Sequence, residues 1–143
     1  MRNTLGILLV VVFLGLGLLH LYWAAGGRLA SGVAVPVVSG RRTFNPSPAG
    51  TVLVTVAFLI AMFIILGQLG KLGDAIPGWV FRLGTSCIAV IFFLRAVGEF
   101  RLVGFFKRVR DTPFAYWDTW LFSPLCLVIA LMAFMLAYTK PGK

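Results

Sequence analysis

The chain is poor in ionisable side chains. Only 12% of its 143 residues are charged, and it holds four acidic residues, one histidine and two cysteines. A soluble domain usually carries about a quarter charged residues, so this composition argues against a soluble protein. It also argues against a metal or cofactor centre, because the sequence offers no Cys-x-x-Cys pair, no second histidine and no nucleophile motif. We therefore expect no metal and no cofactor.

The cysteines and the positive charge exclude further classes. Cys87 and Cys126 lie in separate apolar runs, and free cysteine packs like a small hydrophobic residue, so we expect buried free thiols rather than a disulfide. The net charge of +9 arises from loops and from the ends of apolar runs, with no nucleic-acid-binding motif. We expect no nucleic-acid partner, and instead contact with the anionic head groups of membrane lipids.

What the chain does have is long hydrophobic runs. It is 60% hydrophobic, with a mean hydropathy of +1.00. Helices satisfy their own backbone hydrogen bonds in lipid, and each run is long enough to cross a bilayer. We predict one all-α domain over residues 1–143, a four-helix transmembrane bundle with an interfacial segment between its third and fourth helices. The predicted spans are residues 5–25, 51–70, 78–98 and 113–138.

Three dipeptides mark features of these spans. Ser47-Pro48 and Thr112-Pro113 are typical helix starts, with a capping side chain followed by proline in the first turn. Ser123-Pro124 predicts a kink in the fourth helix. The Ser123 hydroxyl, or a neighbouring helix, is expected to replace the lost backbone hydrogen bond.

The first run has a second interpretation. Arg2 and the small residues 31–34 resemble the two ends of a signal peptide. However, the apolar run is long and continues into His20, Tyr22 and Trp23, which are typical of a membrane-interface anchor. We favour a retained span.

The two membrane faces differ in their polar residues. Four spans place both termini at one face, face A, with residues 71–77; the opposite face, face B, holds residues 26–50 and 99–112. Three of the four acidic residues fall at face B: Glu99, Asp111 and Asp118. Loop arginines and lysines are also more numerous there, so the positive-inside rule favours a cytoplasmic face B.

Two arginines lie near the ends of the third run. Arg82 and Arg95 are separated by twelve apolar or small residues, about 20 Å along a helix, against a bilayer core of roughly 30 Å. At least one must reach an interface or be paired, and we expect Arg82 to reach face A. Glu99 lies one turn beyond Arg95, which predicts an ion pair. The pair either binds a carboxylate or phosphate or locks the third helix to Asp118 of the fourth.

The single histidine has two interpretations. His20 lies beside Trp23 near the end of the first span, where a hydrogen-bonded anchor is the more typical role. Its predicted depth matches that of Glu99 and Asp118, so these three residues are candidate acid–base groups of an enzyme. A metal set of His20 with two carboxylates is a weaker alternative.

Residues 100–110 interleave phenylalanine with arginine and lysine. This pattern is typical of a segment that lies at the lipid head groups, with its aromatic rings in the membrane. The alternative is the wall of a ligand entrance, where Arg101 would supply a cation.

Three stretches carry a resemblance. They are HLYWAAGG from His20, RAVGEFRLVGFFKR from Arg95 and DTWLFSPLC from Asp118. Together they resemble a family of short bacterial four-span membrane proteins of unknown function. The resemblance implies a multi-pass protein of the bacterial inner membrane, and it implies no activity or ligand.

Three functions stay open at this point. We favour binding of an anionic or lipid-like ligand at face B, or an accessory-subunit role, over catalysis. A membrane-embedded enzyme acting on a lipid-like substrate is the alternative, and a small transporter, which would need a homo-oligomer or a larger membrane complex, is the third. The candidate binding residues are Arg95, Glu99, Arg101, His20, Trp23 and Asp118.

Overall fold

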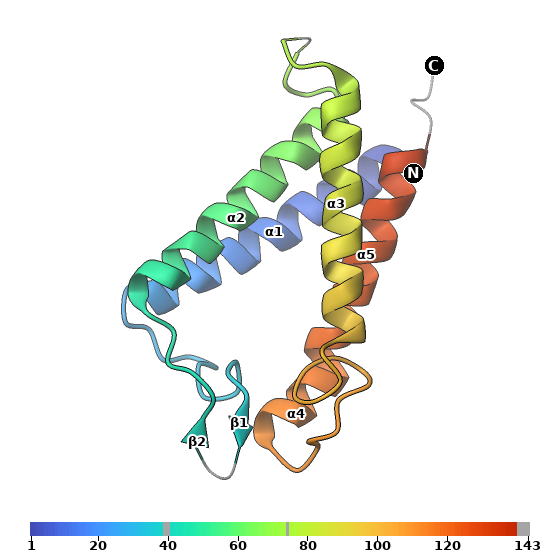
Figure 1. Cartoon of the computed structure of the whole chain (residues 1–143). Coiled ribbons are helices and arrows are strands. Elements are labelled where there is room, and N and C mark those ends of the chain that lie inside the picture. Colours follow the sequence, from blue (N-terminus) through green and yellow to red (C-terminus); the bar gives the residue numbers. More distant parts are fainter. Residues whose placement is uncertain (39–40, 74, 140–143) are drawn as a thin grey trace.

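The computed structural model describes residues 1–38, 41–73 and 75–139. Within these ranges four helical segments are long and apolar enough to cross a membrane. The chain is therefore a multi-pass membrane protein, and the predicted four-helix bundle is confirmed (Figure 1). The spans are α1 (Arg2–Ala24), α2 (Pro48–Gln68), α3 (Gly78–Val97) and a fourth, Pro113–Tyr138, made of α4 (Pro113–Trp117), the π-helical turn η1 (Asp118–Phe122) and α5 (Ser123–Tyr138).

Two of the helix starts follow from capping side chains. The Ser47 hydroxyl accepts a hydrogen bond from the Gly50 N–H at 3.0 Å, and the Thr112 hydroxyl accepts one from the Ala115 N–H at 3.1 Å. In each case a proline follows the cap, where its missing N–H costs nothing. The helix starts predicted at Ser47-Pro48 and Thr112-Pro113 are thus confirmed.

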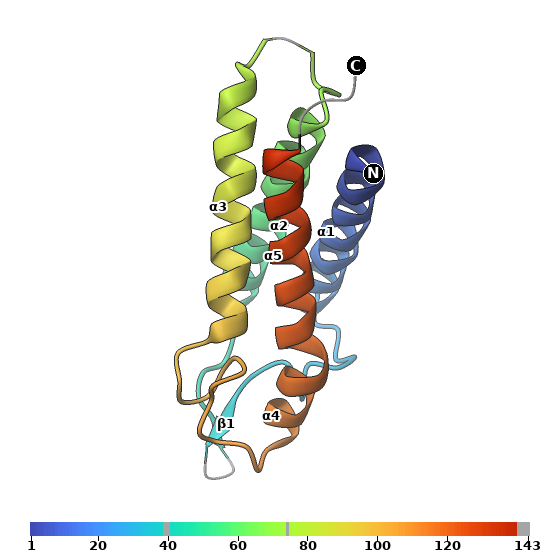
Figure 2. The ribbon, with the colours of Figure 1, turned by 90° about the vertical axis from the view of Figure 1, so that its right-hand side faces the viewer.

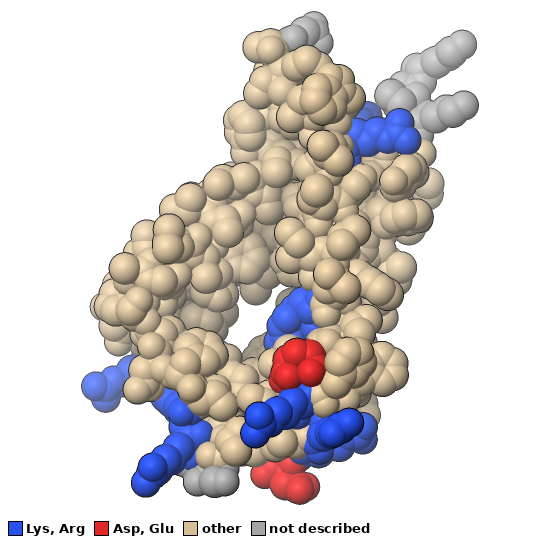
Figure 3. All heavy atoms as spheres, viewed as in Figure 1, with Lys and Arg blue, Asp and Glu red and all other residues tan. Residues whose placement is uncertain are grey.

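The helices form two antiparallel pairs, α1 with α2 and α3 with α5, and the pairs join through α2 against α3 and α1 against α5 (Figures 1 and 2). Much of the core lies in the half of the bundle nearer face A, where the ends of α2 and α5 meet the first half of α1. Toward face B the two pairs separate, and Figure 3 shows the molecule hollowed between them. The core residues are Leu9, Phe13, Ala61, Ile65, Leu69, Ile88, Ala89, Ile129, Ala133 and Leu136.

Close helix approach depends on glycine at one α2–α3 contact. A Cβ added to Gly67 would lie 2.1 Å from an atom of the Phe81 ring. The missing side chain therefore lets this buried ring pack directly on the α2 backbone.

The cysteines differ from the expectation. Both are free, but Cys87 is exposed and Cys126 only partly buried. The apolar run around Cys87 predicts a membrane span, whereas burial depends on which side of α3 meets the other helices. Cys87 lies on the other side, so its predicted burial is wrong.

Candidate functional site

Asp118 lies at the centre of a polar cluster at face B. It is fully buried, at 0% exposure. Its Oδ1 accepts a hydrogen bond from Arg95 Nη2 at 2.9 Å, and its Oδ2 pairs with Lys107 Nζ at 3.0 Å. The Gly104 backbone N–H also donates to Oδ2, at 2.8 Å. A buried carboxylate needs such partners, because leaving water without them is costly.

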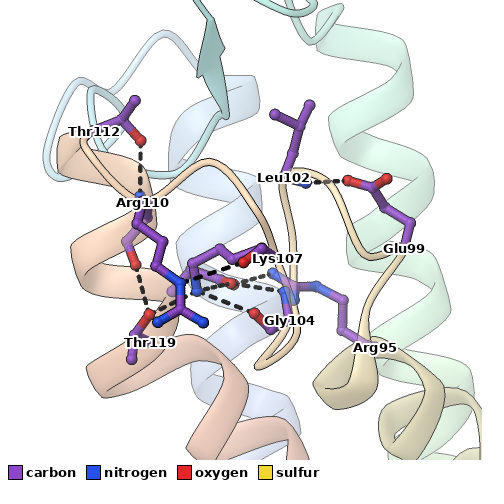
Figure 4. Close-up of polar contacts among 10 residues, drawn as sticks. Arg95, Glu99, Leu102, Gly104, Lys107, Arg110, Thr112 and Thr119 are labelled. Atoms are coloured by element: carbon purple, nitrogen blue, oxygen red, sulfur yellow. Dashed lines mark hydrogen bonds and ion pairs between the residues drawn. The ribbon is translucent and has the colours of Figure 1, made fainter.

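Lys107 is the second buried charge of this cluster, at 2% exposure. Its ammonium reaches three acceptors: Asp118 Oδ2, the Gly104 carbonyl at 3.0 Å and the Thr119 hydroxyl at 2.6 Å. An ammonium has three hydrogens to donate, so all of them are used. We call Arg95, Gly104, Lys107, Asp118 and Thr119 the Asp118 cluster (Figure 4).

The loop after α3 brings this cluster together. Gly98 ends the helix with a φ of 86°, and Gly104 has a φ of 89°. The two glycines lie against each other's backbone: an added Cβ would meet the Val103 carbonyl oxygen at 1.8 Å from Gly98, or the Val97 carbonyl oxygen at 2.3 Å from Gly104. The loop therefore closes on itself, and its Gly104 N–H points at the carboxylate.

The fourth span supplies Asp118 at a change of helix type. The turn η1 begins at Asp118, whose carbonyl oxygen accepts from the Ser123 N–H. Pro124 has no N–H, so it cannot donate a hydrogen bond to the carbonyl four residues before it. The wider π-helical turn η1 lies just before this missing hydrogen bond. The Ser123 hydroxyl was expected to repair the gap, but it is buried and has no hydrogen-bond partner among the described residues.

Glu99 lies outside the cluster. Because α3 ends at Val97, Glu99 is not on the helix, and its carboxylate accepts from the Leu102 N–H instead (Figure 4). The predicted Arg95–Glu99 ion pair is therefore wrong. The alternative contact, Arg95 with Asp118 of the fourth span, is the one the structure contains. Arg101 is exposed, and its carbonyl oxygen accepts from two later residues of the loop.

Sequence reasoning missed Lys107 as a cluster member. The segment 100–110 was predicted to lie at the lipid head groups, and the burial of Lys107 against Asp118 was not predicted. Its neighbours Arg108 and Arg110 are exposed as expected. Nothing in the local pattern separates the three, because the burial of Lys107 follows from the loop closure and not from its own spacing.

A cavity of about 600 Å³ opens beside the Face B ends of α1 and α2. His20 and Trp23 line it from α1, with ring centroids 4.9 Å apart. His20 Nδ1 lies 2.8 Å from the Leu16 carbonyl oxygen. A carbonyl only accepts, so Nδ1 carries the hydrogen, and in the neutral ring Nε2 is left as an acceptor.

The other walls of the cavity come from α2 and from the loop between α1 and α2, residues 25–47. Within that loop, β1 (Val37–Val38) and β2 (Arg41–Arg42) pair antiparallel, with Val37 opposite Arg42. Sequence reasoning missed these walls, since the loop shows no motif. The lining residues other than His20 and Trp23 are Gly27, Ser31, Ala34, Val35, Arg42, Phe44, Asn45, Pro46, Ser47, Gly50, Thr51 and Val54.

The three candidate acid–base residues are not joined. Within the described ranges no hydrogen bond or ion pair connects His20 with Glu99 or Asp118. No group of His, Cys, Asp and Glu in the same ranges is arranged to hold a metal ion. The structure instead separates the site into the Asp118 cluster and the cavity at His20.

Charge is concentrated at face B. In Figure 3 most Lys and Arg side chains of the viewed side lie toward the loops at this end, with acidic side chains among them, and fewer lie at the opposite end. Exposed arginines of both loops contribute: Arg28, Arg41, Arg42, Arg101, Arg108 and Arg110. This surface is suited to anionic groups.

Comparison with protein families found one matching model. The model described as "Protein of unknown function (DUF3995)" matches residues 13–133. These residues include both the cavity and the Asp118 cluster. Comparisons with curated proteins and with solved structures found no match.

Proposed function

We propose that this chain, which belongs to the DUF3995 family of proteins of unknown function, binds an amphiphile with an anionic head group. The observation that carries the proposal is the face B cavity, in which a cation and a histidine share the walls with apolar side chains. Ligand sites commonly combine an apolar lining with a few polar groups that fix orientation.

The polar part of the cavity suits an anion. Arg42 can offer its guanidinium to a carboxylate or phosphate. Ser47, Gly50 and Thr51 place the N-terminus of α2 at the same wall, where the helix dipole favours negative charge. His20 adds an acceptor for a hydroxyl or acid proton of the ligand.

The apolar part suits a hydrocarbon chain. Val35, Phe44 and Val54 line the cavity together with the Trp23 ring. Because α1 and α2 are membrane spans, such a chain could pass from the cavity to the lipid without crossing water. An amphiphile thus matches the cavity better than a wholly polar ion.

The Asp118 cluster takes a supporting part in this proposal. Asp118 and Lys107 neutralise each other within the protein, and Arg95 is committed to Asp118 through Nη2. We assign these groups the role of holding the loop after α3, residues 98–112, against the fourth span. We propose no reaction, because His20 has no carboxylate partner among the described residues.

We propose the bacterial inner membrane as the location, with face B in the cytoplasm. The family resemblance supports the first part, and the excess of basic residues in the loops of face B supports the second. A cysteine introduced at Ser31 should then react with a membrane-impermeant maleimide only in opened cells. Reaction in intact spheroplasts would contradict this orientation.

Native mass spectrometry of the delipidated full chain in detergent tests the binding proposal. The probe is oleic acid, with oleyl alcohol as the uncharged comparison. We expect the wild type to bind one oleate. The affinity should be about tenfold lower in Arg42→Gln, since a charged hydrogen bond contributes about 1.5–3 kcal/mol. Arg108→Gln, an exposed arginine outside the cavity, is the matched control. Equal binding by all three proteins, or equal binding of the alcohol, would overturn the proposal.

A further inference from the structure

A second concave surface lies between α3 and α5, separate from the face B cavity. It is a groove of about 300 Å³ that is almost wholly apolar. The small residues Ser86, Ala89 and Ala130 leave room along it, and larger apolar side chains form its sides. The remaining lining residues are Val90, Phe93, Leu131, Phe134 and Tyr138.

One end of the groove carries a cation. The guanidinium of Arg82 lies over the Tyr138 ring, 5.1 Å from its centroid. Tyr138 also lines the groove, so the charge and the apolar surface are continuous. Arg82 lies near the start of α3, at the face A interface, and its side chain is exposed. That the Arg82 side chain reaches the face A interface stays a prediction.

We propose that this groove binds one anionic glycerophospholipid of the face A leaflet. The phosphate meets Arg82, and one acyl chain lies along the groove between α3 and α5. This site is independent of the cavity at His20 and does not rest on the function proposed for it.

The dimensions fit one leaflet. From Arg82 to Phe93 the helix rises about 16 Å, close to half of a hydrocarbon core of roughly 30 Å. A lipid whose phosphate is held at Arg82 would therefore have its chain end near Phe93, at about the middle of the membrane. Figure 2 shows α3 and α5 running side by side over this length.

The cation distinguishes a lipid from a second protein helix. A protein helix docked in an apolar groove would bind through complementary shape alone. The exposed Arg82 at the mouth of this groove interacts most favourably with an anionic group, which a lipid head group supplies. A basic residue near an anionic lipid surface contributes about 1 kcal/mol, which corresponds to about a fivefold preference for an anionic over a zwitterionic head group.

Photo-crosslinking of the full chain in detergent micelles tests this site. The probe is phosphatidylglycerol with a diazirine on one acyl chain, and the labelled residues are mapped by mass spectrometry. We expect labelling concentrated at Val90, Phe93 and Phe134. Unlabelled phosphatidylglycerol should compete about fivefold better than phosphatidylcholine with the same chains.

Three variants make the test specific. Arg82→Gln should lower groove labelling about fivefold, whereas Arg101→Gln, an exposed arginine of face B, should leave it unchanged. Val90→Trp places a large side chain at an exposed groove position and should block labelling without loss of the folded bundle. Even labelling of all lipid-facing residues, or equal labelling in Arg82→Gln and Arg101→Gln, would overturn the proposal.

Discussion

Replacing Asp118 by asparagine should destabilise the bundle strongly, because it removes the anion that two cations share. Lys107 would remain buried with an ammonium facing only neutral acceptors, the Gly104 carbonyl and the Thr119 hydroxyl. Asparagine keeps the shape of the side chain, so the change tests charge rather than packing. One of its two terminal groups is also a donor, which would face either Arg95 or the Gly104 N–H.

The size of the effect follows from burial. The side chains of Asp118 and Lys107 are 0% and 1% exposed, so their pair is within the protein, and breaking such a pair typically costs about 3–5 kcal/mol. The Arg95 side chain is 34% exposed, so its ion pair contributes less, and its buried Nη1 has no hydrogen-bond partner among the described residues. We therefore expect a decrease of about 3 kcal/mol in the free energy of unfolding. Adding Lys107→Met should restore part of it, because the uncompensated ammonium is then gone.

The assay is reversible unfolding in mixed detergent micelles with increasing dodecyl sulfate, followed by far-ultraviolet circular dichroism. Asp111→Asn is the control, since Asp111 is an exposed acid of the same loop and should change stability by less than about 0.5 kcal/mol. Two results would refute the claim that the Asp118 cluster holds the loop after α3 against the fourth span. One is a loss of unfolding free energy in Asp118→Asn no larger than that in Asp111→Asn. The other is a further, additive loss when Lys107→Met is combined with Asp118→Asn.

Three further substitutions test the loop and the fourth span. Gly104→Ala should lower stability by about 2 kcal/mol, because its Cβ would meet the Val97 carbonyl and its φ is positive; Gly32→Ala, with open space around it, should change little, as measured by the same unfolding assay. Glu99→Gln should cost less than about 1 kcal/mol, since the amide oxygen can still accept from the loop; a loss as large as that of Asp118→Asn would restore the case for an Arg95–Glu99 pair. Ser123→Ala should raise the melting temperature, because it removes a buried hydroxyl that has no partner among the described residues, and a decrease would reveal a partner for that hydroxyl.

The spans were predictable because their signal is local and strong. A stretch of about twenty predominantly apolar residues has few alternatives to a membrane helix. Ser47 and Thr112 mark two helix starts through contacts within one turn. The observed spans begin within about three residues of the predicted ones, and α3 begins at the predicted Gly78.

The site was only partly predictable because its contacts are not local. Arg95 and Asp118 were predicted as site residues because they are charges in or near spans, and the structure brings them together. Lys107 joins them only because Gly98 and Gly104 close the third loop, which no charge pattern indicates. His20 and Glu99 share a predicted depth, but depth does not say which helices pair, and the separation of the helix pairs at face B leaves them unconnected.

The central claim is that an anionic amphiphile occupies the cavity beside His20, and quenching of Trp23 fluorescence tests it most directly. Trp23 lines that cavity, and Trp23→Phe leaves the other three tryptophans as the background signal. Titration with a bromine-labelled fatty acid should quench the Trp23 contribution with saturation, and Arg42→Gln should shift the midpoint about tenfold upward. Quenching that is unsaturable, and equal in the wild type and in Arg42→Gln, would contradict the claim.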